Sequence, residues 1–352
     1  MNKEWENEFN IFYEEYTGKI NEYYEEINKK KNKTIVAASM IIIALIIVFL
    51  LGTYEINNII PNGYILQIIG GILIIVVSCG AVVLKIKQEL SSKSIDIIHN
   101  IIKNISKDDN CFFNPKNRIN NKNIEEMGLF NLNNLKYNGR NAIAANYNGN
   151  MMNFADMELF YFKDKVREEV YYDSQGIKHI KTIKSKIKKE FFSGCYISAT
   201  LNKKIADHIY LIPNNLKEIV INGTINEYIK YPGEKLELEN LEFSEKYRVY
   251  SKDEIQARYI LSLKLMEQIN QIDDILPGKK YIVFKEGRRF AICIQDFKIE
   301  DLKKTTLPLN KNSEKLKSNI RYIYKNIYKL FEIYNILDLG NDLYVNNYVD
   351  KK

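Results

Sequence analysis

The sequence predicts an α+β protein. An N-terminal amphipathic helix and a transmembrane helical hairpin are expected to precede a cytoplasmic antiparallel-sheet domain, which carries one long buried helix and ends in a C-terminal amphipathic helix. Three observations predict this fold: an aromatic near-heptad pattern, two apolar segments without charged residues, and short apolar runs separated by turn signals. Because 352 residues exceed the usual size of one domain, we expect five parts, at residues 1–33, 34–84, 85–110, 111–310 and 311–352.

The first element is an amphipathic helix over residues 1–33. Its apolar positions recur every three or four residues, which is the spacing of one helix face. These positions are Trp5, Phe9, Phe12, Tyr16, Ile20, Tyr23 and Ile27. Two interpretations fit this pattern: the face packs on another helix of the same or a sister chain, which we favour, or it docks on a specific partner.

The second element is a hairpin of two apolar segments, residues 34–52 and 64–84, joined by a short external loop at 53–63. Each segment has about 20 residues without a charge, enough to cross ~30 Å of hydrocarbon as a helix. Lysines flank the pair, whereas the loop contains Glu55 and no Lys or Arg. By the positive-inside rule, the sequence predicts a two-span protein of the cell membrane with both termini in the cytoplasm. We interpret the hairpin as an anchor, since its spans contain no ionisable group.

Two further helices have one apolar face each. Isoleucines at helical spacing predict a juxtamembrane helix within residues 85–110. The C-terminal helix, within 311–352, has the apolar face Ile320, Ile323, Tyr324, Ile327, Phe331 and Tyr334. It either packs on the other two helices, which we favour, or lies on anionic lipid.

Between residues 111 and 310 the pattern changes to strands. Asn148-Gly149, residues 173–176 (DSQG) and Glu286-Gly287 predict hairpin turns. The arm after DSQG also fits a basic amphipathic helix, but the turn and the Tyr-rich arm before it favour a strand. Further strands are predicted at GCYISATL, HIYLIP, LKEIVING and KLELEN.

One long helix is predicted after Ser251. Ser251 and Glu254 form a capping-box pattern at its start. The apolar positions continue to Ile272 and indicate burial on more than one side: Ile255, Tyr259, Leu261, Leu263, Leu265, Met266, Ile269 and Ile272.

Two stretches, FFSGCYISATLNKKIADHIYLIPN and LELENLEFSEKYRVYSKDEIQARYILSLKLMEQI, resemble the bacterial family DUF3137. The resemblance extends over Asn123–Ile294 and the hairpin. It implies two N-terminal membrane spans followed by a cytoplasmic domain, and the family carries no assigned activity. The signature positions, which we expect to be structural, are Gly194, Pro213, Phe243, Tyr250, Asp253, Arg258 and Tyr259.

Catalytic patterns are missing from the sequence. The cysteines Cys79, Cys111, Cys195 and Cys293 are isolated, which argues against a disulfide framework or a zinc site. The chain also lacks the motifs of phosphate-binding loops, zinc proteases and nucleophile elbows, so we expect no enzyme activity, no cofactor and no metal. A hydrolase that uses Cys195, with His179 or His208 as base, is the least favoured hypothesis.

The predicted function is therefore a membrane-anchored binding or scaffolding module of unknown biochemical activity. The alternative is a protein that binds lipid or another amphiphile at the inner leaflet. The net charge of +7 suits an anionic surface. Expected partners are the lipid bilayer, anionic lipid headgroups and a second copy or a membrane protein, but no nucleic acid. The sequence leaves open the ligand, the oligomeric state and the packing partner of the C-terminal helix.

Overall fold

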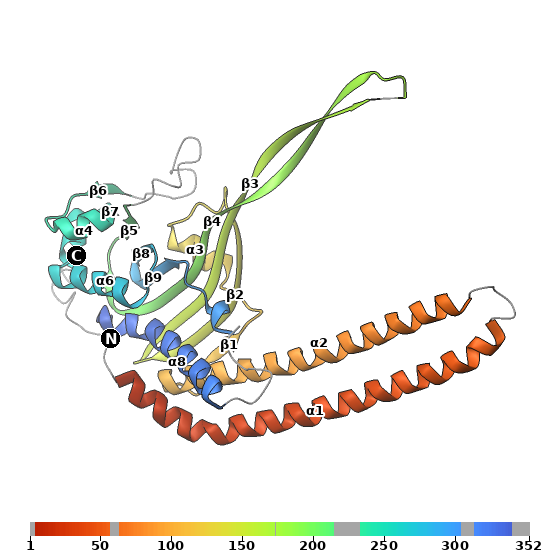
Figure 1. The fold of residues 1–352 in the computed structure, drawn as a ribbon. Helices are drawn as coiled ribbons and strands as arrows, with labels where there is room; N and C mark the ends of the chain where they lie inside the picture. The colour runs from red at the N-terminus through yellow and green to blue at the C-terminus, as the bar shows by residue number, and fades with distance from the viewer. Residues whose placement is uncertain (1–3, 57–62, 173, 215–232, 304–312, 340–352) are drawn as a thin grey trace. The chain divides into compact units, whose positions relative to one another are not determined.

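The computed structural model describes residues 4–56, 63–172, 174–214, 233–303 and 313–339 (Figure 1). The described residues fall into two compact units. A helical unit contains residues 4–56, 63–98 and 313–324, and a sheet unit contains residues from 99 to 303 and from 325 to 339.

The helical unit consists of helix α1 (Glu4–Ile56), most of α2 (Gly63–Ser106) and the first half of α8 (Ser313–Ile336). The predicted aromatic face of α1 is buried, with Tyr16 half-buried. Phe9 packs on Tyr324 with 5.6 Å between ring centroids, and Glu26 pairs with Lys93 at 2.6 Å. The interpretation that this face packs on helices is confirmed, and the helices belong to the same chain.

The predicted transmembrane hairpin is wrong. Residues 34–52 lie in α1 and residues 64–84 in α2, so each predicted span continues into an amphipathic helix. A spanning helix needs about 20 consecutive apolar residues. Among the helices within the described ranges, none is long and apolar enough to cross a membrane.

The sheet unit is built on nine described strands in the order β1-β2-β3-β4-β9-β8-β5-β7-β6, and every neighbouring pair is antiparallel. An α+β class with an antiparallel sheet is thus confirmed. The strands are β1 (Phe112–Asn114), β2 (Lys136–Tyr147), β3 (Asn150–Tyr172), β4 (Lys178–Ile205), β5 (Ile209–Pro213), β6 (Glu234–Leu236), β7 (Tyr247–Ser251), β8 (Lys280–Lys285) and β9 (Gly287–Gln295).

The predicted hairpin turns at Asn148-Gly149 and Glu286-Gly287 are confirmed, whereas Asp173 of the third predicted turn lies outside the described residues. Asn148 and Gly149 connect β2 to β3 with positive φ angles of 51° and 81°. Two-residue hairpin turns in which both φ angles are positive favour the pair Asn-Gly. Gly287 (φ 91°) starts β9 after β8. The arm after DSQG is part of the 28-residue strand β4, so the predicted strand is confirmed over the alternative of a basic amphipathic helix. The predicted strand LKEIVING lies outside the described residues, and of KLELEN only its first two residues belong to a strand, β6.

β3 pairs with β4 from Met152 to Tyr172, with one irregularity. Leu159 lies opposite Phe192 and Phe160 lies opposite Glu190, so Phe191 is an extra residue on β4. Beyond this bulge, the two strands leave the sheet as a two-stranded ribbon (Figure 1).

The single long helix predicted after Ser251 is wrong. Two helices occupy this region, α5 (Glu254–Ile260) and α6 (Leu263–Ile275), because Leu261 caps the first and Ser262 starts the second. Asp253 is the N-cap of α5, and Ser251 ends β7. The expected stripe is buried at Leu261 and from Leu265 to Ile272, whereas Ile255, Tyr259 and Leu263 are exposed. The short helix α4 (Leu241–Lys246) precedes β7.

Helices pack against both faces of the sheet. On one face, α3 (Asn121–Met127) and the segment after it pack over Tyr196, Tyr281 and Cys293. On the other face, Phe331 of α8 contacts Phe154 of β3, with ring centroids 5.0 Å apart. Residues 313–324 of α8 belong to the helical unit and residues 325–336 to the sheet unit. The short helix α7 (Ile299–Lys303) follows β9.

Candidate binding cleft on the sheet

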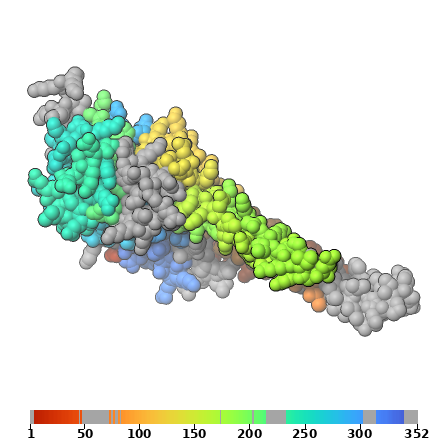
Figure 2. Space-filling view, turned by 90° about the horizontal axis from the view of Figure 1, so that it is seen from above, coloured from red at the N-terminus to blue at the C-terminus, as the bar shows by residue number. Residues whose placement is uncertain are grey.

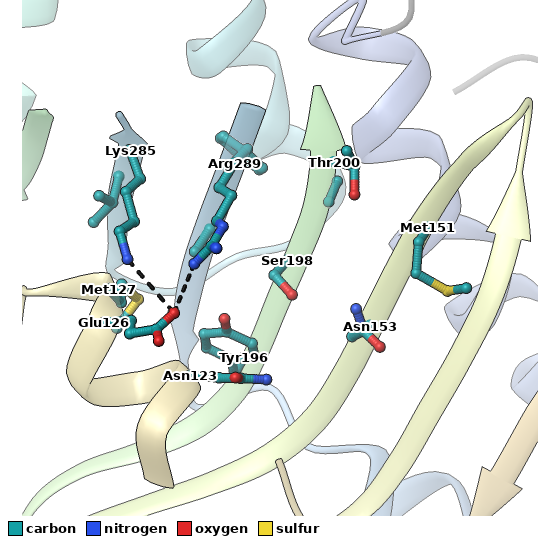
Figure 3. A pocket seen from close by; sticks show the side chains of 14 residues that line it. Asn123, Glu126, Met127, Met151, Asn153, Tyr196, Ser198, Thr200, Lys285 and Arg289 are labelled. Carbon is teal, nitrogen blue, oxygen red and sulfur yellow. Dashed lines mark hydrogen bonds and ion pairs between the residues drawn. The ribbon is translucent and has the colours of Figure 1, made fainter. Parts of the chain in front are cut away.

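A cleft of about 270 Å³ lies beside α3, on the face of the sheet that α3 covers (Figure 3). Strands β3, β4, β8 and β9 form its floor and α3 forms a wall. Its polar lining residues are Asn123, Glu126, Asn153, Tyr196, Ser198, Thr200, Lys285 and Arg289. Met127, Met151, Val283 and Ala291 add apolar surface.

The strand register places the floor residues side by side. Asn153 lies opposite Ser198, Ser198 opposite Ala291, and Ala291 opposite Val283, so one row crosses four strands. Cross-strand neighbours of this kind share one face of a sheet. The centre of the row consists of a serine and an alanine. Their small side chains leave the space that the cleft occupies.

Helix α3 is held by its own sequence. The side chain of Asn120 accepts a hydrogen bond from the backbone N–H of Lys122 and caps the helix, and Gly128 ends it with a left-handed φ of 73°. Ile124 and Met127 are buried against the sheet. Glu126, between them, is thereby directed toward the cations of β8 and β9 (Figure 3).

The charged end of the cleft is an ion-pair cluster. Arg289 donates a hydrogen bond to Glu126 at 2.6 Å, and Lys285 Nζ lies 3.7 Å from the same carboxylate. The hydrogen bond from Arg289 lowers the pKa of Glu126. Burial and the neighbouring Arg289 lower the pKa of Lys285. Lys122 lies 3.9 Å from Glu126, so three cations surround one carboxylate and the cluster has a net positive charge.

Tyr196 supplies a neutral donor near this cluster. Burial raises its pKa to about 12, and a hydrogen bond with Ser198 partly offsets that effect. The phenol therefore keeps its proton at neutral pH. Its face of β4 also carries Ser198 and Thr200, so β4 contributes three hydroxyl groups to the cleft.

The family-signature positions lie outside the cleft and make structural contacts. Gly194 lies where β4 approaches β9, and a Cβ there would overlap the carbonyl oxygen of Ile294. Phe243 is buried, Asp253 caps α5 through the N–H of Gln256, and Arg258 donates to Glu254 and to the carbonyl of Glu237. The remaining three are Pro213 at the end of β5, the half-buried Tyr250 on β7, and the exposed Tyr259 on α5.

The structure separates Cys195 from the two candidate bases. The thiol is fully buried, and burial raises its pKa well above the usual range. His179 is on the same strand 16 positions away, which is ~50 Å in an extended chain. His208 precedes β5, from which β4 is separated by β8 and β9. Within the described part of the chain, no group of three or more His, Cys, Asp or Glu residues could hold a metal ion.

Sequence reasoning missed the cleft residues. Glu126 and Arg289 are 163 positions apart, and only the fold brings them together. A weak signal existed in YIVFKEGRRF, where alternation places Lys285 and Arg289 on one face of the predicted hairpin.

The fold and the cleft define an α+β protein with an antiparallel sheet and a polar surface site. Residues 190–339 match the model of the family DUF3137, described as a protein of unknown function, so the predicted family is confirmed over that part of the chain. The matched range includes the cleft residues of β4, β8 and β9 but not α3. No curated protein matches the chain. Among solved structures, the crystal structure of the mycobacterial trehalose monomycolate transport factor A, TtfA, aligns at 9% identity with a TM-score of 0.30, covering 68% of this chain and 95% of that one.

Proposed function

We propose that this chain is a binding module, without catalytic activity of its own, that holds a small anionic amphiphile in the cleft of the sheet unit. The observation that carries the proposal is the cluster of Lys285 and Arg289 around Glu126, in a cleft that Met151, an exposed apolar side chain, also lines. An anionic headgroup would accept hydrogen bonds from both cations and from neutral hydroxyl groups.

The apolar part of the ligand would lie along the floor. Val283 and Ala291 are buried floor residues, and Met151 at the rim is 48% exposed. Ligand sites combine apolar surface with a few placed polar groups in this way, although 270 Å³ is small for such a site. A single short acyl or alkyl chain therefore fits better than a full phospholipid.

Scaffolding and self-assembly stay predictions. The aromatic face of α1, which motivated them, is already packed within the chain. The cleft is therefore better supported as a binding site than the aromatic face of α1. A cysteine hydrolase is disfavoured because Cys195 is buried with a raised pKa.

Calorimetric titration of the full chain with octyl sulfate, below the concentration at which it forms micelles, tests the proposal. Octyl sulfate is an amphiphile of constant charge, and inorganic sulfate is the matched anion without an alkyl chain. We expect saturable binding of octyl sulfate. Arg289→Gln should weaken it about fivefold, because the lost contact is partly solvent-exposed. Tighter binding of inorganic sulfate than of octyl sulfate would restrict the ligand to a simple anion.

Two further variants locate the site. Ser198→Leu places a larger side chain at the centre of the floor and should abolish binding. Arg288→Gln removes the same charge from the neighbouring position of β9, whose side chain points to the other face of the sheet, and should leave the affinity unchanged. Equal losses in Arg288→Gln and Arg289→Gln would show that octyl sulfate binds elsewhere, and the proposal would fail.

A further inference from the structure

The ribbon of residues 160–172 and 178–190 extends from the sheet and has no core of its own. Every described residue from 161 to 190 is exposed or half-exposed. The ribbon has 13 residue pairs in register, which correspond to about 40 Å. Figure 2 shows it as a narrow arm, in green, that leads away from the rest of the sheet unit.

One face of the ribbon combines apolar and basic side chains of the two strands with two acidic ones, Asp164 opposite Lys186 and Glu168 opposite Thr182. The register pairs Phe162 with Lys188, Val166 with Lys184, Val170 with Ile180, and Tyr172 with Lys178, and Lys186 lies between the first two rows. We call this the lysine face. Its apolar residues are Phe162, Val166, Val170, Tyr172 and Ile180, which are between 50% and 67% exposed.

The opposite face differs in the apolar surface that it offers. It carries Lys163, Lys165 and Arg167 on β3, opposite Ile187, Ser185 and Ile183, and it also carries Lys181, Lys189 and Glu169. Ile187 is only 37% exposed and Ile183 is half-buried, whereas Tyr171 is 52% exposed. The lysine face therefore presents the larger apolar surface.

Protection of strand edges explains only the lysines. Lysine on an unpaired edge prevents the edge from pairing with another chain. It gives no reason for a phenylalanine, two valines and a tyrosine on a face without a core, where polar residues would serve equally well. Exposed apolar surface of this kind indicates a partner.

The chemistry of the lysine face fits a lipid surface better than a nucleic acid. Lysines neutralise phosphates in either partner. Nucleic acid would stack its bases on aromatic rings, but Val166, Val170 and Ile180 offer no ring. At a lipid interface, by contrast, phosphate groups and acyl chains lie a few ångströms apart, as do the lysines and apolar residues of this face.

The geometry points to a docking role for the ribbon: its lysine face binds a membrane surface that contains anionic lipid. Phe162, Val166, Val170 and Tyr172 enter the boundary between headgroups and acyl chains, and Lys178, Lys184 and Lys186 contact lipid phosphates. The contact is peripheral and is made by strands. It is independent of the cleft, whose residues lie on the sheet beyond the bulge.

Vesicle sedimentation with the full chain tests this inference. Vesicles of phosphatidylcholine with phosphatidylglycerol provide the anionic surface, and pure phosphatidylcholine is the neutral reference. The variant Lys178→Gln/Lys184→Gln/Lys186→Gln should reduce partition to the anionic vesicles at least tenfold. The control Lys163→Gln/Lys165→Gln/Lys181→Gln removes three charges from the opposite face over a similar length and should reduce it far less. Equal reductions would overturn the assignment to the lysine face.

A fluorescent label gives a second readout that does not depend on affinity. Val170→Cys places a polarity-sensitive dye on the lysine face, and Lys165→Cys places it on the other. Anionic vesicles should shift the emission of the first dye to the blue and leave the second nearly unchanged. An unshifted Val170→Cys label, or binding of duplex DNA in place of vesicles that is lost in the first triple variant, would overturn the inference.

Discussion

Arg289 donates a hydrogen bond to Glu126 at 2.6 Å, which joins β9 to α3 across 163 positions of sequence. The same carboxylate is the only acidic group among the residues that line the cleft. Glu126 therefore has two opposite roles. It orders the cations of the cleft, and it competes with any anion for them.

Glu126→Gln should bind octyl sulfate more tightly than the unchanged chain. The substitution removes the competing negative charge and keeps a side chain of the same size. We expect a gain of about threefold to tenfold, because the cluster is partly screened by solvent. Calorimetry measures it. Weaker binding in Glu126→Gln would contradict the prediction and would mean that the ordering of Arg289 and Lys285 by the carboxylate matters more than its competition with the anion.

The affinity for octyl sulfate should fall as the pH of the titration is raised over an alkaline range. Burial lowers the pKa of Lys285, so this lysine loses its charge at a lower pH than an ordinary lysine. Lys285→Arg keeps its charge over the whole range. The difference in affinity between the unchanged chain and Lys285→Arg should therefore grow with pH. Parallel pH profiles would exclude Lys285 from the site.

Gly194→Ala should strongly destabilise the sheet unit. A Cβ at this position would overlap the carbonyl oxygen of Ile294, and a backbone atom cannot move aside without shifting β9. We expect a loss of about 3 kcal/mol or more in the free energy of unfolding, measured by urea denaturation. Gly18→Ala, in the interior of α1 with no heavy atom within 4 Å of the new Cβ, is the control and should stabilise slightly. If Gly194→Ala unfolded at the same urea concentration as the unchanged chain, the close approach of β4 to β9 would be contradicted.

Asp156→Asn should destabilise the chain by about 1–3 kcal/mol. Asp156 of β3 accepts hydrogen bonds from the backbone N–H groups of Ile299 at 2.6 Å and Glu300 at 2.9 Å, and also from the side chain of Asn141. An amide has one oxygen for these three donors. Asp164→Asn, on the exposed ribbon, should have little effect. Thermal unfolding of both variants measures the difference.

The same carboxyl group predicts a pH dependence. Burial raises the pKa of Asp156, so between the ordinary and the raised pKa the native state binds more protons than the unfolded chain. Its contribution to stability therefore falls as the pH rises through this window. The stability of Asp156→Asn should lack that part of the slope, and identical slopes would contradict the raised pKa.

The features that could be predicted are those that depend on residues close together in the sequence. Asn148-Gly149 specified its turn through two positive φ angles, and the spacing from Trp5 to Ile27 specified the buried face of α1. The helix after Ser251 was predicted too long because its apolar pattern continues through Ser262, where a serine N-cap starts a second helix. The hairpin of residues 34–84 was predicted from its two uncharged apolar segments and the lysines that flank them, although each segment is one part of a longer helix, α1 or α2.

The cleft could not be predicted because its cations and its carboxylate are distant in sequence. Glu126 belongs to the short helix α3, near the start of the sheet unit in sequence, whereas Arg289 belongs to β9, much later in the sequence. Nothing local to either residue indicates the other. Only the strand order, which places β9 beside β4, brings the hydroxyl groups of β4 to the same place.

The extra residue Phe191 restricts how the gene can change. On the sheet side of the bulge, Tyr196 and Ser198 face the cleft, whereas on the ribbon side the even-numbered Lys184 and Lys186 face the opposite way. Deleting one codon between 178 and 191 would exchange the faces of every β4 side chain on one side of the deletion. Removing two codons from each arm would shorten the ribbon and keep both faces. Among relatives that keep this ribbon, its length should therefore differ by two residues per arm, or by multiples of two.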